Sequence, residues 1–192
     1  EPSVLQYADF AVWQRQWLNE DVLRDQLQYW RTRLAGLSVL ALPTDYPRPQ
    51  AQRFTGSYRA IDLTEPLLAK LARLSVQRGS TLFMTLLAAF QILLGRYVGQ
   101  QDVAVGVPIA NRTRLSTEGI VGTFVNTLVM RTDLSGNPTF TEVLRRVREV
   151  ALGAYDHQDL PFERLVEELG TKRDLSNSPL VEVLFNVANA PM

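Results

Sequence analysis

Apolar residues recur at helical spacing along the first 36 residues of the chain. The pattern breaks near Asn19, and Gly36 follows its last apolar position. Because apolar residues three and four positions apart line one face of a helix, two consecutive helices are predicted. The residues that form the two stripes are Phe10, Trp13, Trp17, Leu23, Leu27, Trp30 and Leu34.

The following part of the chain changes between extended and helical patterns. Residues 43–56 hold three prolines and no sustained periodicity, which predicts an extended surface connection. Residues 57–63 alternate weakly, as a strand does, and Thr64 is placed to cap a helix that stops at Gly79. Residues 82–94 are apolar almost all round, so we expect a helix buried between layers.

The second half of the chain carries the stronger strand patterns. Three segments of strand length either alternate apolar and polar residues or are apolar throughout: 102–109, 124–134 and 180–188. Thr139-Phe-Thr-Glu142 is a capping box that opens a further helix, and residues 161–169 form a short one. This irregular mixture favours an α/β (α+β) fold in which helices cover a mixed sheet.

Composition narrows the possible functions. The 20 basic and 20 acidic side chains cancel, which disfavours nucleic acid and anionic membranes as partners. The chain has no cysteine, so disulfides, thiolate catalysis and zinc–thiolate sites are excluded, and a reducing, cytoplasmic setting fits. The chain begins without Met or a signal-peptide pattern, and we interpret it as cut from something larger.

His157 is the only histidine and lies in a segment that invites a catalytic interpretation. No nucleophile-elbow sequence accompanies it, so a hydrolase triad is disfavoured. With Asp159 and Glu163 it does not form a recognised metal-ligand spacing, and we expect no metal site. We interpret the segment as structural: Asp159 would cap the helix that begins at Pro161, and His157 would hydrogen-bond locally in the turn.

Asn126 is a polar residue inside a strand whose two faces are both largely apolar. A buried amide must be hydrogen-bonded, either to neighbouring backbone or to a molecule that enters a cavity. The strand pattern alone favours a structural role over a ligand contact.

Arg145, Arg146 and Arg148 lie off the apolar stripe of their helix and form a small basic edge. A solvated helix face is the simpler interpretation, and docking of an acidic partner is the alternative. The paired glycines near residues 99–106 and 119–122 lack a phosphate-loop lysine and a dinucleotide fingerprint, so nucleotide binding is unsupported.

Four segments, taken in order, resemble the last four core motifs of nonribosomal peptide synthetase condensation domains. The last of them includes Arg173 and Asp174, and Arg131 follows the second. The segments are Tyr7-Ala-Asp-Phe-Ala-Val-Trp13, Val121-Gly-Thr-Phe-Val-Asn-Thr127, His157-Gln-Asp-Leu-Pro-Phe-Glu163 and Arg173-Asp-Leu-Ser-Asn-Ser-Pro-Leu180. Two stretches between them, 42–49 and 105–112, resemble the same family.

The resemblance implies the chloramphenicol-acetyltransferase-like fold of CoA-dependent acyltransferases, in which two similar lobes enclose a tunnel. Residues 1–192 would then be the C-terminal lobe, truncated at both ends, and the N-terminal lobe would be its first partner. Donor and acceptor carrier proteins would insert 4′-phosphopantetheine arms, with an adenylation domain in the parent and no cofactor bound directly. The acceptor amine would attack the donor thioester to form an amide.

The resemblance also assigns roles to individual residues. Asn126, with Gly122 and Thr127, would approach the substrate channel, while the basic edge is a weak candidate for carrier docking. The family's catalytic His-His-three residues-Asp-Gly motif is missing, so no catalytic residue is expected here. The remaining motif residues would be architectural: Tyr7, Asp9, Trp13, Arg131, His157, Asp159, Pro161, Glu163, Arg173 and Asp174.

Several functions remain open at this point. The stretches Pro43-Thr-Asp45 and His157-Gln-Asp159 look most like the subtype that joins an L-configured donor. An epimerization-type domain shares the fold, and a non-catalytic condensation-like module could recruit a carrier protein or a tailoring enzyme. The polar segment 111–119 could be the loop that this lobe sends across to the other.

Overall fold

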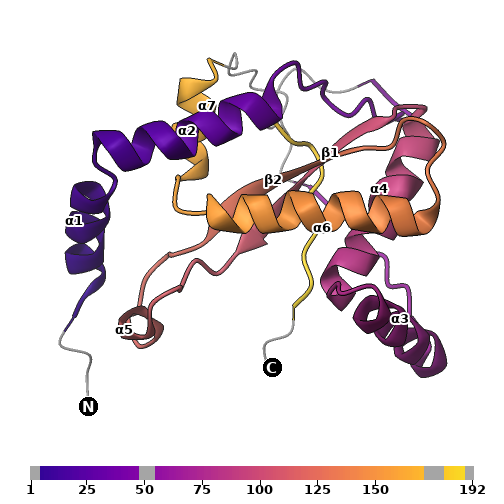
Figure 1. Cartoon of the computed structure of the whole chain (residues 1–192), viewed down its shortest axis with the longest axis horizontal. Helices are drawn as coiled ribbons and strands as arrows, with labels where there is room; N and C mark the ends of the chain where they lie inside the picture. The colour runs from indigo at the N-terminus through magenta and orange to yellow at the C-terminus, as the bar shows by residue number, and fades with distance from the viewer. Residues whose placement is uncertain (1–4, 48–54, 171–179, 189–192) are drawn as a thin grey trace.

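A computed structural model describes residues 5–47, 55–170 and 180–188 of the chain (Figure 1). Two antiparallel strands form its sheet, and helices lie around them. The elements are α1 (Tyr7–Trp17), α2 (Glu20–Leu34), α3 (Glu65–Gln77), α4 (Leu82–Val98), β1 (Asp102–Ile109), α5 (Leu115–Glu118), β2 (Asn126–Asp133), α6 (Phe140–Asp156) and α7 (Phe162–Glu168).

The sheet is the centre of the core. The register pairs Asp102 with Asp133 at one end and Ile109 with Asn126 at the other. Both faces of β2 are largely buried, as the alternation of its residues predicted, and α4 and α6 pack against the sheet. In Figure 1, α6 runs in front of the sheet, while α1 and α5 both lie beyond the same end of the strands. The predicted α/β fold is confirmed.

Gln91 shows how the mostly apolar helix α4 is oriented on the sheet. Its fully buried amide nitrogen donates to the carbonyl of Met130 at 2.8 Å and to that of Val103 at 3.3 Å. In the first turn of α4, the hydroxyl of Thr85 lies 2.7 Å from that of Ser75 and joins α4 to α3. Buried polar groups need such partners, so these contacts fix the helix in one orientation.

The strand predicted at residues 180–188 is reduced to one parallel bridge, between Gly106 and Leu184. The Gly106 amide donates to the Val183 carbonyl at 2.9 Å, and the Phe185 amide donates to the Gly106 carbonyl at 2.8 Å. The backbone groups of Pro108 point to the same edge of β1 as those of Gly106, two positions earlier. Proline has no backbone N–H, so Pro108 cannot donate the next hydrogen bond to residues 180–188. This explains why the pairing does not extend in that direction.

Two further expectations need correction. Residues 57–63 are extended and exposed but form no strand, since no other segment in the described part of the chain pairs with them. The segment 111–119, expected as a loop, contains the single turn α5. Among the described residues no single helix is long and apolar enough to cross a bilayer; α3 and α4 meet that criterion only together, and they meet at 104°.

Candidate functional site: the β1–β2 connection and its anchors

The β1–β2 connection, residues 110–125, is held by the aromatic face of α1. The Tyr7 hydroxyl donates to the carbonyl of Thr123 at 2.8 Å, and the Tyr7 ring meets Phe124 edge-on at 5.2 Å. Phe10 packs on the same ring at 4.5 Å between centroids. A Cβ at position 122 would collide with the Tyr7 ring, so Gly122 permits this close approach. The first two predicted motif segments therefore touch.

Asn126 joins this connection to the third motif segment. Its Nδ2 donates to the carbonyls of Gln158 at 2.8 Å and Leu160 at 2.9 Å. Its Oδ1 accepts from the amides of Thr127 and Phe162, each at 2.9 Å. An asparagine side chain offers two donors and two acceptor positions, so all four are used. The side chain is buried, and its hydrogen bonds are structural.

The N-terminus of α7 differs from the expectation. Asp159 was expected to cap it, but α7 begins after Pro161 without a side-chain cap, and Asn126 binds the Phe162 amide instead. Asp159 lines a small space shared with Trp13 and Arg114. Burial raises the pKa of the Asp159 carboxyl, and the nearby Arg114 partly offsets this. Glu163 lies exposed in the first turn of α7.

His157 makes its contacts at the end of α6 with residues of this chain. Its Nδ1 lies 2.8 Å from the carbonyl of Gly153, and its ring stacks on Tyr29 with centroids 3.8 Å apart. Its own carbonyl accepts from the indole of Trp30 at 2.9 Å. These contacts join the end of α6 to α2.

Arg131 ties the sheet to the end of α2. Its guanidinium forms a two-pronged pair with Asp102, with its shortest contacts at 2.8 Å. It also donates to the carbonyls of Arg33 at 2.9 Å and Ala35 at 2.8 Å. The hydrogen bond to Asp102 is the main cause that raises the Arg131 pKa. The architectural role assigned to Arg131 by its motif stays a prediction, and Arg173 and Asp174 lie outside the described residues.

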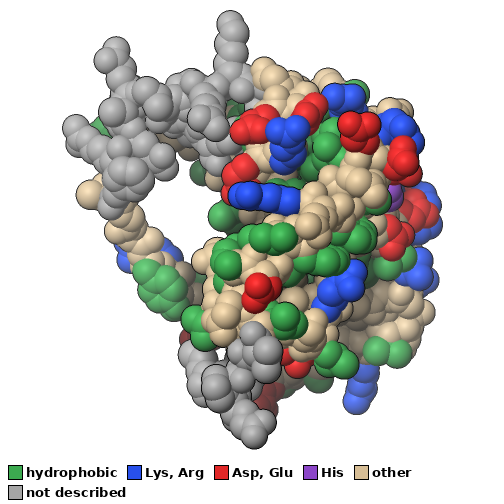
Figure 2. Space-filling view, turned by 90° about the vertical axis from the view of Figure 1, so that its left-hand side faces the viewer, with side chains coloured by type: hydrophobic (Ala, Val, Ile, Leu, Met, Phe, Trp, Pro, Cys, Tyr) green, Lys and Arg blue, Asp and Glu red, His purple; other side chains and the backbone are tan. Residues whose placement is uncertain are grey.

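A cavity of about 230 Å³ lies between α1 and part of the β1–β2 connection, beside these contacts. Figure 2 views this side of the molecule and shows hydrophobic side chains gathered across it, with acidic and basic side chains around them. Trp13 is stacked by the Arg114 guanidinium at 4.2 Å, at one border of the cavity. The side chains that line it are Leu5, Asp9, Phe10, Trp13, Arg114, Ser116, Thr117 and Ile120.

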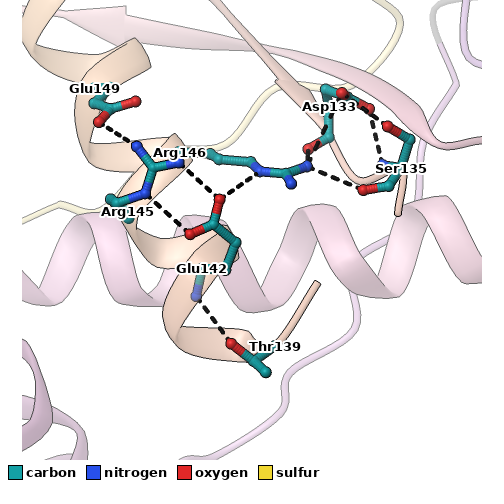
Figure 3. A network of polar contacts seen from close by, with 7 residues as sticks. All are labelled: Asp133, Ser135, Thr139, Glu142, Arg145, Arg146 and Glu149. Atoms are coloured by element: carbon teal, nitrogen blue, oxygen red, sulfur yellow. Dashed lines mark hydrogen bonds and ion pairs between the residues drawn. The ribbon is translucent and has the colours of Figure 1, made fainter. Parts of the chain in front are cut away.

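The basic edge of α6 is occupied by contacts within the chain (Figure 3). Arg145 pairs with Glu142 at 2.7 Å and with Glu149 at 2.5 Å, and Arg146 binds Glu142 at 3.1 Å. Arg148 donates to the carbonyl of Gly79 beyond α3 at 2.8 Å. Carrier docking at this edge stays a prediction, and an acidic partner would compete with these acceptors.

The acid sensitivity of this network is testable at Glu142. Its two arginine partners lower the pKa of the carboxyl from 4.5 to about 2. Since the folded pKa is the lower one, the unfolded chain takes up a proton first as pH falls. The stabilisation is therefore complete above pH 4.5 and disappears toward pH 2. Glu142→Gln should lower the urea midpoint at pH 7, and this difference from wild type should be much smaller at about pH 2.5, while Glu118→Gln serves as control. An equal difference at both pH values would contradict this.

Arg112 was not among the predicted site residues. Its guanidinium donates to the carbonyls of Thr117, of Ile120 at 2.9 Å and of Gly122 at 3.3 Å. It also lies 4.1 Å from the centre of the Phe124 ring. The sequence feature that could have indicated Arg112 is a charged residue between a buried strand and a polar, glycine-containing segment. Neither periodicity nor a catalytic motif marks such a position.

Two solved structures with a similar fold contain the X-domain from teicoplanin biosynthesis. The chain superposes on the X-domain from teicoplanin biosynthesis with a TM-score of 0.90 at 33% identity, covering 96% of this chain and 42% of that one. With the X-domain in its complex with OxyB, the TM-score is 0.91 at 32% identity, and the coverage is the same.

Sequence comparisons identify the family. A family model described as condensation domain matches residues 1–192. The chain is 59% identical to a linear gramicidin synthase protein from Brevibacillus parabrevis over 98% of its own length, but it spans only 4% of that relative. It is 44% identical to tyrocidine synthase 3 from the same organism over 99% of its length, and it spans 3% of that protein. The chain therefore belongs to the condensation domain family of nonribosomal peptide synthetases.

Proposed function

We propose that this chain is the C-terminal lobe of a condensation domain that forms amide bonds between carrier-bound aminoacyl or peptidyl thioesters, with an L-configured donor. In this reaction the acceptor amine attacks the thioester carbonyl. A carbon–nitrogen bond forms, the carbon–sulfur bond breaks, and the donor phosphopantetheine leaves as a thiol while the amine loses a proton. The similarity to a linear gramicidin synthase supports this assignment.

The geometric observation that carries the proposal is the meeting of three motif segments at the β1–β2 connection. Tyr7 reaches this connection from α1, and Asn126 binds three residues of the segment that ends in α7. Between these anchors, Val121 is 93% exposed and Val125 is 61% exposed. Exposed apolar side chains on an anchored segment suit a surface that another lobe or a substrate covers.

The proposed channel role of Asn126 is indirect. Because its amide is saturated by protein groups, it would hold Thr127 and the connection in place while Gly122 and its exposed neighbours face the channel. Catalysis would need the N-terminal lobe, which carries the family's paired histidines. His157 does not replace them, since its ring is stacked on Tyr29 and bonded to Gly153.

The proposed partners follow from the same function. Donor and acceptor carrier proteins would deliver substrates on 4′-phosphopantetheine, and an adenylation domain in the same synthetase would load them. A crystal structure of a four-domain nonribosomal peptide synthetase, described as bound to AMP and glycine, contains a region that superposes on this chain. The TM-score is 0.84 at 28% identity, over 89% of this chain and 13% of the synthetase.

A second function is a non-catalytic module that recruits another protein. The observation that favours it is the similarity to the teicoplanin X-domain, which was also solved as a complex with OxyB. The two functions differ in whether the complete domain turns over carrier-bound thioesters.

The decisive experiment loads two carrier proteins with aminoacyl groups and measures dipeptidyl thioester by mass spectrometry. We expect product with the complete condensation domain and none with residues 1–192 alone. Product from residues 1–192 alone would show that the catalytic groups lie in this chain. No product from the complete domain, combined with stable binding of another protein, would favour recruitment.

A further inference from the structure

Arg112 holds the β1–β2 connection at three points. It lies three residues after β1, and its guanidinium donates to carbonyls at positions 117, 120 and 122. Thr117 and Ile120 are buried, with 5% and 4% of their surface exposed. The three acceptors lie within six residues, so a single planar group ties residues 117, 120 and 122 together.

The segment has little other support in its own backbone. Two hydrogen bonds form one short turn. The Thr117 amide donates to the Arg114 carbonyl at 2.9 Å, and the Ile120 amide donates to the Thr117 carbonyl at 3.3 Å. Beyond Ile120 the chain passes Val121 and Gly122 before Phe124 becomes buried. The Arg112 guanidinium also lies over the Phe124 ring. It therefore contacts the buried residues on both sides of the exposed stretch 121–123.

Arginine is suited to this role because its guanidinium is planar, always charged and carries five donors in a fixed arrangement. Lysine keeps the charge over the Phe124 ring, but its compact ammonium cannot reproduce the fork that binds three carbonyls. Substitution by lysine therefore separates the charge from the geometry.

We propose that Arg112 is a positioning residue that sets the wall of the substrate channel at residues 120–125. It acts through the backbone of this segment and touches no reacting atom. The inference rests on the proposed amide-forming function and specifies how this lobe contributes to it: a rigid wall orients the donor thioester against the acceptor amine. Misplacement of a positioning surface by about 1 Å can cost on the order of 100-fold in rate.

The test uses the complete condensation domain with two loaded carrier proteins. Arg112→Lys should lower kcat by roughly 10- to 100-fold, with KM for each carrier within about twofold of wild type, since carriers dock outside the channel. Arg24→Lys on the exposed face of α2 is the matched control and should leave both constants unchanged. Arg112→Gln retains a hydrogen-bond donor without the charge, and its kcat should fall at least as far as that of Arg112→Lys.

Hydrogen exchange distinguishes positioning from general loss of stability. In Arg112→Lys the hydrogen-bonded amides of Thr117 and Ile120 should exchange faster, while those of Leu128 and Met130, which pair with β1, keep their protection. Wild-type kcat in both variants would overturn the inference and leave the proposed function intact. Loss of protection throughout β2 in parallel with activity would also overturn it, because Arg112 would then be a general stabiliser. Absence of product from the wild-type domain would overturn the proposed function together with the inference.

Discussion

Replacing Asn126 with alanine is expected to lower the free energy of unfolding by about 3–4 kcal/mol, because it leaves four backbone groups without partners. These are the carbonyls of Gln158 and Leu160 and the amides of Thr127 and Phe162. Each buried group left unsatisfied costs about 1–3 kcal/mol, and the four costs are not additive because they share one side chain.

Urea denaturation followed by tryptophan fluorescence measures this effect. Asn186→Ala, at an exposed position, is the control and should stay within about 0.5 kcal/mol of wild type. Asn126→Asp tests the direction of the hydrogen bonds, since it keeps both acceptors but turns an oxygen toward two carbonyls. It should be as damaging as alanine at neutral pH. A loss below about 1 kcal/mol for Asn126→Ala would contradict the role of this side chain.

Replacing Gly106 with valine is expected to cost about 3 kcal/mol and to displace residues 181–185 from the sheet. A Cβ at this position would lie 2.6 Å from Cδ2 of Leu184 and 2.9 Å from Cγ2 of Val181. Leu184 is exposed and has room to turn away, but Val181 is only 4% exposed. The bridge at Gly106 is therefore the weak point of this edge of the sheet.

The Gly106 prediction has a matched control in the same chain. A Cβ at Gly119 would meet nothing within 4 Å, and its φ of −83° suits any residue. Gly119→Val should change stability by less than about 1 kcal/mol. Amide exchange should show Phe185 losing protection in Gly106→Val. Retained protection there would mean that the segment tolerates a side chain at position 106.

The helices could be predicted from sequence because their causes are local. The apolar face of α6 repeats at helical spacing, and Thr139 caps it by accepting from the Glu142 amide at 3.3 Å, as predicted. The second half of that capping box is replaced, because the Glu142 carboxylate binds Arg145 and Arg146 instead. A competing partner one turn away is visible in the sequence only as charge spacing.

The strands were harder to predict because pairing is not local. Residues 57–63 alternate as a strand would, but alternation cannot supply a neighbouring strand. Residues 180–188 have an apolar face, yet their pairing with β1 depends on Gly106 and Pro108, far earlier in the chain. Sheet edges are decided by such distant residues.

The sequence indicated most residues of the candidate site but not which residues they contact. The sequence showed that Asn126 must be hydrogen-bonded, but its partners beyond Thr127 lie 32 to 36 residues away in the chain. For the same reason Asp159 was expected to cap α7. In the structure, Asn126 of β2 accepts the hydrogen bond from the Phe162 amide instead. Arg112 escaped notice because its acceptors are backbone carbonyls, which carry no mark in a sequence.

Asn126 joins the β1–β2 connection to the segment before α7 through a fully bonded side chain, and this role can be measured directly. Selective ¹⁵N-asparagine labelling of the complete condensation domain tests it by following exchange of the side-chain NH₂ protons. The Asn126 NH₂ is predicted to exchange far more slowly than that of exposed Asn186, because the Asn126 side chain is buried and both of its NH₂ protons are held by backbone carbonyls. If the Asn126 NH₂ exchanged as fast as that of Asn186, Asn126 would not join these two segments.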